Sequence, residues 1–113
     1  MMTIAIRSDL QIKYYLNLHN DSAATDSDAF LFEIISYLLR VIDSKQKQLS
    51  YDNLKFSSKS LKYVFGDRVN DETFKKNLVQ ALKEMIAAGS LETDADFIKI
   101  TKLGISKFYT VND

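Results

Sequence analysis

The strongest hydrophobic pattern of the chain lies in residues 70–88. Apolar side chains recur there at spacings of three and four, which places them on one face of an α-helix: Phe74, Leu78, Ala81, Leu82, Met85 and Ile86. The side chain of Asn70 can accept hydrogen bonds from the free amides of a first turn, and Gly89 is the residue type favoured after a helix end. Val69 and Phe74 flank this start as a hydrophobic staple. The pattern predicts a helix of about five turns that begins at Asn70.

Two short apolar segments follow this predicted helix. Residues 90–92 and 97–100 are separated by the polar segment 93–96, a pattern typical of two strands joined by a turn. The residues after 100 predict a second short helix.

The most apolar segment is 30–42, where ten of thirteen residues are apolar or tyrosine. Polar side chains form only a narrow stripe at Glu33, Ser36 and Arg40, so the helix predicted here needs cover on most sides. An N-terminal hairpin, the C-terminal helices or a second copy of the chain could supply that cover.

A shorter helix is predicted between the two long ones. Ser57 and Ser58 precede it as capping residues, and Gly66 follows it. The apolar positions at helical spacing are Leu61, Val64 and Phe65. A polar connector, 44–50, separates this helix from the helix over 30–42.

Alternation of apolar and polar residues characterises the N-terminal segment, 1–18. A period of two, which predicts a half-buried strand, runs through Leu10, Ile12, Tyr14, Leu16 and Leu18. Ile4 and Ile6 repeat the pattern, and together the two segments predict an N-terminal strand or hairpin. Ser8 and Gln11 could instead form a capping box that opens a helix. Residues 19–28 are polar and turn-forming, and predict a surface loop that ends in the N-cap of the next helix.

Composition fits one domain over residues 1–113, with the helical core in 29–113. With 46% hydrophobic residues, no proline and three glycines, the chain suits a mainly helical α+β fold. It has no cysteine, which excludes disulfides, thiolate metal sites and a cysteine nucleophile. The start lacks a basic leader before an apolar run, and the longest apolar segment is shorter than the ~20 residues a bilayer span requires. We therefore expect a cytoplasmic protein with no membrane partner.

Fifteen basic and fifteen acidic side chains cancel, but they are unevenly distributed. Residues 1–33 hold two basic and five acidic groups, residues 40–68 hold seven and three, and residues 69–113 hold six and seven. The positive middle segment is either an ordinary solvated face or part of a nucleic-acid footprint, and the zero net charge modestly favours the first.

The C-terminal half resembles winged helix-turn-helix domains. In residues 87–91 an apolar helix end is followed by glycine and leucine, and Thr101-Lys102-Leu103-Gly104 matches a threonine-lysine-x-glycine entry into a last helix. The resemblance extends over residues 58–108, with 30–42 as the first helix. It implies a winged-helix core, with the hairpin as the wing and the helix over 70–88 as the recognition helix.

Winged helices serve as DNA readers, protein-docking modules and dimerisation units, so the surface chemistry has to decide between these roles. On a recognition helix the side chains turned away from the apolar face could contact base edges or phosphates. Lysines of the preceding segment could anchor the DNA backbone. The nucleic-acid contacts predicted in this way are Lys55, Lys59, Lys62, Thr73, Lys76, Gln80 and Lys83.

Acidic residues oppose DNA binding at two places. Asp71 and Glu72 suit the positive end of the helix dipole, but they lie where a groove-reading helix meets phosphates. The predicted wing carries Glu92, Asp94 and Asp96, which would repel a phosphate backbone. An acidic wing fits solvent or a basic protein partner better.

The sequence predicts no catalytic, cofactor or metal residue. His19 lies beside Asp21 and Ser22, but no nucleophile motif surrounds them. The aspartate pairs 26/28 and 94/96 lack the glycine and glutamate of a calcium loop, and the three glycines are isolated from one another. Most tyrosines and phenylalanines lie at core-facing spacings, which favours packing over base stacking.

These patterns together predict a non-enzymatic regulatory binding module of the winged-helix type. Double-stranded DNA is the leading partner, as in a transcription regulator. Protein docking or homodimerisation, through the 30–42 helix and the N-terminal hairpin, is the close alternative, and this apolar surface also leads us to expect a homodimer.

Overall fold

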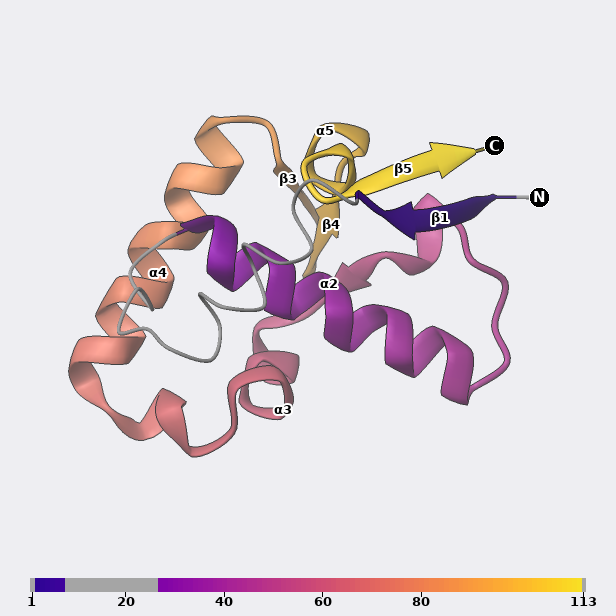
Figure 1. The fold of residues 1–113 in the computed structure, drawn as a ribbon. Helices are drawn as coiled ribbons and strands as arrows, with labels where there is room; N and C mark the ends of the chain where they lie inside the picture. Colours follow the sequence, from indigo (N-terminus) through magenta and orange to yellow (C-terminus); the bar gives the residue numbers. More distant parts are fainter. Residues whose placement is uncertain (1, 8–26, 113) are drawn as a thin grey trace.

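The computed structural model describes residues 2–7 and 27–112, and its central element is helix α2 (Ser27–Ser44). In Figure 1 this helix crosses the middle of the molecule, with α4 (Glu72–Ala87) on one side and α3 (Leu61–Phe65) below. Its buried side chains are Phe30, Leu31, Phe32, Ile34, Ile35, Leu38 and Ile42. The predicted helix with cover on most sides is thus confirmed. Among the described residues, α3, α4 and the sheet supply this cover.

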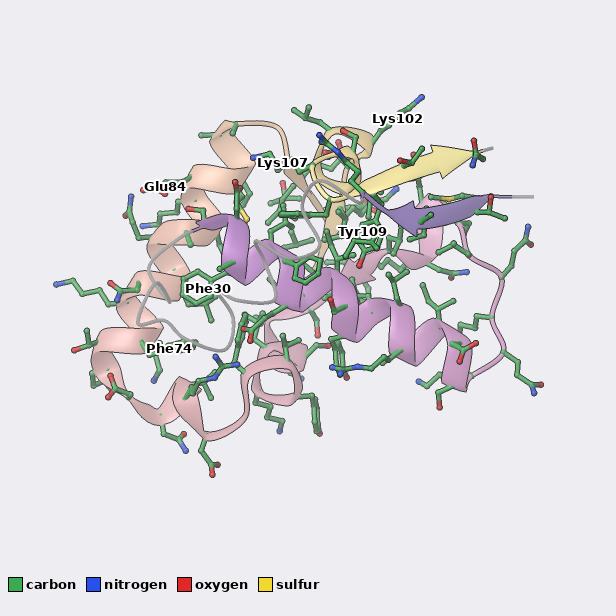
Figure 2. The ribbon with its side chains drawn as sticks, viewed as in Figure 1. Phe30, Phe74, Glu84, Lys102, Lys107 and Tyr109 are labelled. Atoms are coloured by element: carbon green, nitrogen blue, oxygen red, sulfur yellow. The ribbon has the colours of Figure 1, made fainter. Side chains whose placement is uncertain are left out.

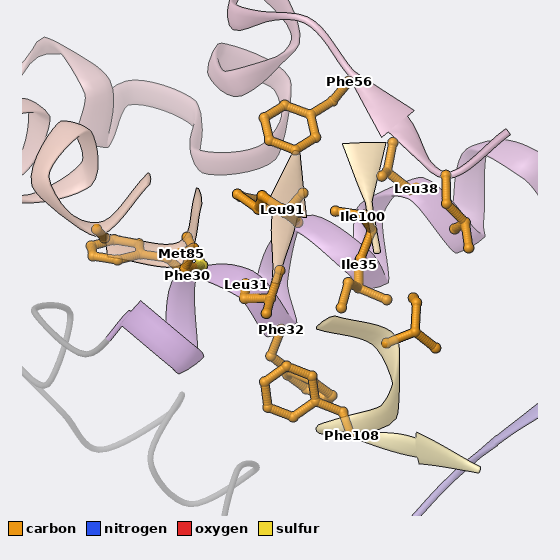
Figure 3. Close-up of a cluster of buried hydrophobic side chains, with 14 of the residues drawn as sticks. Phe30, Leu31, Phe32, Ile35, Leu38, Phe56, Met85, Leu91, Ile100 and Phe108 are labelled. Carbon is orange, nitrogen blue, oxygen red and sulfur yellow. The ribbon is translucent and has the colours of Figure 1, made fainter. Parts of the chain in front are cut away.

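A three-stranded antiparallel sheet forms another side of the core. Its strands β2 (Lys55–Phe56), β3 (Leu91–Asp94) and β4 (Phe97–Ile100) lie in the order β2-β4-β3. Phe56, Leu91 and Ile100 are buried and belong to the same cluster as the side chains of α2 (Figure 3). The sequence analysis predicted β3 and β4 but not β2, because a two-residue strand has no periodicity of its own.

The hairpin between β3 and β4 has a tighter turn than the sequence predicted. Thr93 and Asp94 pair with Ile98 and Phe97, so they continue the strand instead of belonging to the turn. Ala95 starts the remaining two-residue turn with a φ of 54°. The predicted pair of strands is confirmed, and the predicted four-residue turn is wrong.

The N-cap of helix α4 lies one residue later than the predicted cap at Asn70. Asn70 ends a 3₁₀ turn, and the N-cap is Asp71, whose Oδ1 accepts from the backbone amide of Phe74 at 2.9 Å. The predicted end is confirmed, because Gly89 has a φ of 83°. Its amide and that of Ser90 donate to the carbonyls of Ile86 and Met85, the two bonds of a Schellman motif.

Helix α3 is present where the sequence predicted it, and Gly66 closes it with a φ of 63°. The predicted serine caps are wrong. Residues Ser58–Ser60 form a 3₁₀ turn ahead of the helix, and the Oγ atoms of Ser57 and Ser60 lie 3.3 Å apart. The helix is therefore entered through a turn, without a side-chain cap.

The hydroxyl of Thr101 links helix α5 (Lys102–Ser106) to the end of α4 by hydrogen bonds. The Oγ1 of Thr101 donates to the carbonyl of Gly89 at 2.6 Å and accepts from the amide of Gly104 at 3.1 Å. The threonine-lysine-x-glycine segment therefore caps α5 and anchors it to the α4 terminus.

The ends of the described chain form a second, two-stranded sheet. Strand β1 (Thr3–Ile6) pairs antiparallel with β5 (Tyr109–Asn112), as Figure 1 shows. The predicted N-terminal strand is present, but this partner is a C-terminal strand that the sequence analysis did not predict. The other predicted strand, over residues 10–18, and most of the 19–28 loop lie outside the described residues. Ser27 and Asp28 already belong to α2 and not to the loop.

The fold class is α+β, as predicted. Helices α2, α3 and α4, followed by the β3–β4 hairpin on a three-stranded sheet, are compatible with a winged-helix-like fold. No helix in residues 2–7 and 27–112 has the length and apolarity needed to span a bilayer.

Candidate nucleic-acid interface

Four of the predicted contact residues share the exposed side of α4. Thr73, Lys76, Gln80 and Lys83 all line one open depression along this helix, and we call them the α4 outer face. Thr73 and Lys83 lie ten residues apart, which corresponds to about 15 Å along a helix. Within the described part of the chain, neither Lys76 nor Lys83 has a carboxylate at ion-pair distance.

Packing on the opposite side of α4 fixes which residues face outward. Leu78, Ala81 and Met85 are buried. Phe74 packs edge-on against Phe30 of α2, with ring centroids 5.5 Å apart, and Figure 2 places both rings where the two helices meet. The orientation of the α4 outer face is therefore set by the core and not by the surface residues themselves.

Arg68 holds the segment between α3 and α4 in place. Its Nε donates to the carbonyl of Phe65 at 3.1 Å, and its Nη2 lies 3.1 Å from Oε1 of Glu33 on α2. Its guanidinium also lies 5.3 Å from the ring centroids of both Phe65 and Phe74. Arg68, one of the seven basic side chains in residues 40–68, therefore makes its contacts within the fold.

A groove separates α3 from α4, with a volume of about 350 Å³. Lys59, Lys62 and Lys75 stand around it, and its walls include Leu61, Val69, Val79 and Leu82. No carboxylate is among the described residues that line it. We call it the α3–α4 groove. Lys75 and Val79 also line the depression along α4, which includes Glu72 as its one carboxylate, so the groove and the depression form one continuous, predominantly basic surface.

Lys75 belongs to this surface although the sequence analysis left it out. On a helical wheel it lies beside Leu78 and Leu82, near the border of the apolar face, so the outward set excluded it. Its Nζ lies 3.8 Å from Oε1 of Glu72, one turn earlier. The signal that could have identified it was the neighbouring helix, because Lys75 lines the groove that α4 forms with α3.

Lys55 lies apart from the other predicted contacts. It sits on β2 opposite Lys99 of β4, and its Nζ is 4.7 Å from the centroid of the Phe97 ring. Six of the seven predicted residues therefore lie on the α3–α4 side, whereas Lys55 lies on the three-stranded sheet β2-β4-β3.

The wing presents carboxylates, as the sequence predicted. Glu92, Asp94 and Asp96 are exposed. Phe97 stands among them with 41% of its surface exposed. Lys99 is 3.7 Å from Asp52, which offsets its charge.

Gln80 has a partner within its own helix. Its amide nitrogen donates to Oε1 of Glu84 at 3.3 Å, while Oγ of Ser27 donates to Oε2 of Glu84 at 2.8 Å. These bonds, the one from Ser27 first, lower the pKa of Glu84 because they favour the ionised carboxylate. Glu84, labelled in Figure 2, thereby ties the start of α2 to α4. Beside it, Lys107 is 3.1 Å from Asp28, which adds a link from α2 to the residues after α5.

The other candidate residues from the sequence lie outside the described residues or outside the candidate interface. His19, Asp21, Ser22 and Asp26 lie outside the described residues. Tyr63 is an exception to the expected packing of aromatic residues, since it is 66% exposed with the Nζ of Lys62 5.1 Å from its ring. Among residues 2–7 and 27–112, no group of histidine, aspartate or glutamate side chains is arranged to hold a metal ion.

Comparison of the chain with protein-family models, with curated proteins and with solved structures finds no match. The candidate interface therefore rests on its own geometry and charge.

Proposed function

We propose that this chain is a non-enzymatic, winged-helix-type binding module whose α4 outer face enters the major groove of duplex DNA. The observation that carries the proposal is the continuous surface of α3 and α4, where five lysines and one glutamate, Glu72, line two adjoining depressions, one of which also holds Thr73 and Gln80. An α-helix fits the major groove, and lysine contacts to phosphate supply affinity without sequence information.

The roles within this surface follow from position. Lys76 and Lys83 project from the α4 outer face toward flanking phosphates. Gln80 lies between them and Thr73 lies one turn before Lys76, and both serve as hydrogen-bonding groups for base edges. Lys59 and Lys62 at α3 would contact the neighbouring stretch of backbone. The acidic wing stays away from the phosphates, so the affinity is modest for a protein of zero net charge.

The test is a titration of a fluorescent random duplex at two salt concentrations. Each phosphate contact steepens the fall of affinity by ~0.9 log unit per log unit of salt, so Lys76→Glu with Lys83→Glu should weaken binding and flatten the slope by about 1.8. Lys47→Glu with Lys102→Glu is the matched control, because it makes the same charge change at two exposed lysines away from α4. No binding of the unmodified protein at low salt would overturn the proposal.

Protein docking is the second candidate function. The aliphatic walls of the α3–α4 groove favour it, because phosphate contacts have no use for apolar surface. It becomes the leading function if the duplex titration fails.

A further inference from the structure

The chain carries two exposed surfaces of opposite character. The α3–α4 groove is apolar and ringed by Lys59, Lys62 and Lys75. The wing tip, residues 94–97, carries two carboxylates next to an exposed phenylalanine. We propose that the wing tip of one copy docks in the α3–α4 groove of a second copy, with Phe97 as the anchor.

The geometry of the hairpin supports Phe97 as the anchor. Asp94 and Phe97 are paired in the β3–β4 register, so their side chains lie on the same face of the sheet. Lys55 lies over the ring of Phe97 and keeps it on that face. A large aromatic side chain held in the open with little conformational freedom is typical of residues that dominate an interface.

The groove suits one such side chain. Its volume of about 350 Å³ is at the lower end of the range for ligand pockets, enough for an aromatic anchor but not for a whole helix. The described lining holds no carboxylate that would repel the carboxylates of a partner, and Glu72 beside Lys75 lies outside this lining. The apolar walls take the ring while Asp94 and Asp96 approach the lysines at the rim.

A wing tip that occupies the groove has to belong to a second molecule. Phe97 is fixed in β4, the central strand of its sheet, and this strand is hydrogen-bonded to β2 and β3. The wing tip therefore cannot leave the sheet to fill the groove of its own chain. A partner copy brings the required combination of one aromatic ring and two carboxylates, and the zero net charge of the chain permits close approach.

The same lysines serve the proposed DNA contact, so the two partners would compete. This consequence rests on the proposed function, whereas self-association does not. Substitutions can separate self-association from DNA binding. Phe97 belongs only to the docking surface, and Lys83 belongs only to the α4 outer face.

Sedimentation velocity from micromolar to millimolar concentration at low salt tests the docking. We expect the unmodified chain to form dimers or longer chains that dissociate as salt rises. Phe97→Ala should weaken association about tenfold or more, as loss of an interface anchor does. Leu103→Ala is the matched control, since this leucine is also exposed, at 54%, but lies on α5. Circular dichroism confirms that each variant is folded.

A mixing experiment identifies the two halves of the contact. Phe97→Ala lacks the anchor, and Lys59→Glu with Lys62→Glu lacks the rim charge, so each variant alone should stay monomeric. Their mixture retains one intact wing tip and one intact groove and should form a dimer that grows no further. Monomeric behaviour of the unmodified chain at millimolar concentration, or association of Phe97→Ala equal to that of the unmodified chain, would overturn the proposal. Lys76→Glu with Lys83→Glu should weaken DNA binding but keep association, so failure of one proposal is distinguishable from failure of the other.

Discussion

At the scale of single residues, Gly104 and Thr101 explain why the last helix sits where it does. A Cβ atom placed on Gly104 would lie 2.3 Å from the carbonyl oxygen of Ser90, which is buried. Only glycine allows this close approach of two backbones. Thr101 then secures the contact by bonding to both Gly89 and Gly104.

We predict that Gly104→Ala destabilises the fold. Alanine is favoured over glycine inside a helix by about 1 kcal/mol, but a clash with a backbone atom that cannot rotate away costs about 1–3 kcal/mol or more. The cost of the clash should exceed the gain in helix propensity, so the midpoint of thermal unfolding should be lower. Lys102→Ala, an exposed change in the same helix, should shift the free energy of unfolding by no more than ~0.5 kcal/mol. Equal midpoints for the two variants would mean that α5 does not pack on Ser90.

We predict a pH effect at Glu84. The hydrogen bonds from Ser27 and Gln80 lower the pKa of Glu84 in the folded state. The stability they supply is therefore present above the ordinary glutamate pKa and is lost as the pH falls through the lowered pKa. Ser27→Ala removes the larger cause, so a carboxyl NMR titration should find the pKa of Glu84 raised toward its ordinary value. Ser106→Ala removes a hydroxyl that donates to the carbonyl of Leu103 and not to Glu84, so it should leave that titration unchanged. A Glu84 pKa unmoved by Ser27→Ala would contradict the assignment.

At the scale of elements, each helix is stabilised by a different balance of local and distant contacts. Helix α4 carries its own signals, with Asp71 at one end and the Gly89 motif at the other. Helix α2 depends on tertiary burial, because its residues pack against α3, α4 and the sheet (Figure 3). The consequence is that core substitutions in α2 affect the whole fold.

We predict that Ile35→Ala in α2 lowers the free energy of unfolding by about 2–5 kcal/mol, because it leaves a cavity in a fully buried site. Chemical denaturation measures this loss. Arg40→Ala on the exposed stripe of the same helix should cost no more than ~0.5 kcal/mol. An unchanged denaturation midpoint for Ile35→Ala would remove α2 from the core.

At the scale of the whole molecule, charge is separated although the net charge is zero. The α3–α4 side is basic and the wing is acidic, so the molecule offers different faces to an anionic partner and a cationic one. This separation underlies both the DNA proposal and the docking of a second copy.

We predict that Asp94→Asn with Asp96→Asn leaves duplex binding equal or stronger, because it removes repulsion between the wing and the phosphates. The same variant should weaken self-association, because it removes charges that face the groove lysines. Fluorescence anisotropy and sedimentation measure the two effects. Asp94→Glu with Asp96→Glu keeps the charges and serves as the control. Weaker duplex binding by the asparagine variant would show that these carboxylates help to position the wing on DNA.

Much of the candidate surface was predictable, and the exceptions share a cause. Thr73, Lys76, Gln80 and Lys83 follow from the apolar face of α4, since the opposite side of an amphipathic helix is outward by geometry. The separate position of Lys55 and the place of Lys75 in the groove were not predictable in this way. Their surroundings are set by β4 and α3, and the spacing of residues along their own segments does not reveal those elements.

The sequence by itself determined helices α3 and α4, the β3–β4 hairpin and α5. These elements depend on caps, glycines and periodicity within a few residues of each other, and such local signals are visible in the chain. Only the tertiary structure decided the pairing of β1 with β5, the addition of β2 to the wing sheet, and the meeting of α3 and α4 in a groove. These features join residues far apart in sequence, and strand partners and facing helices are chosen by the packing of the whole core.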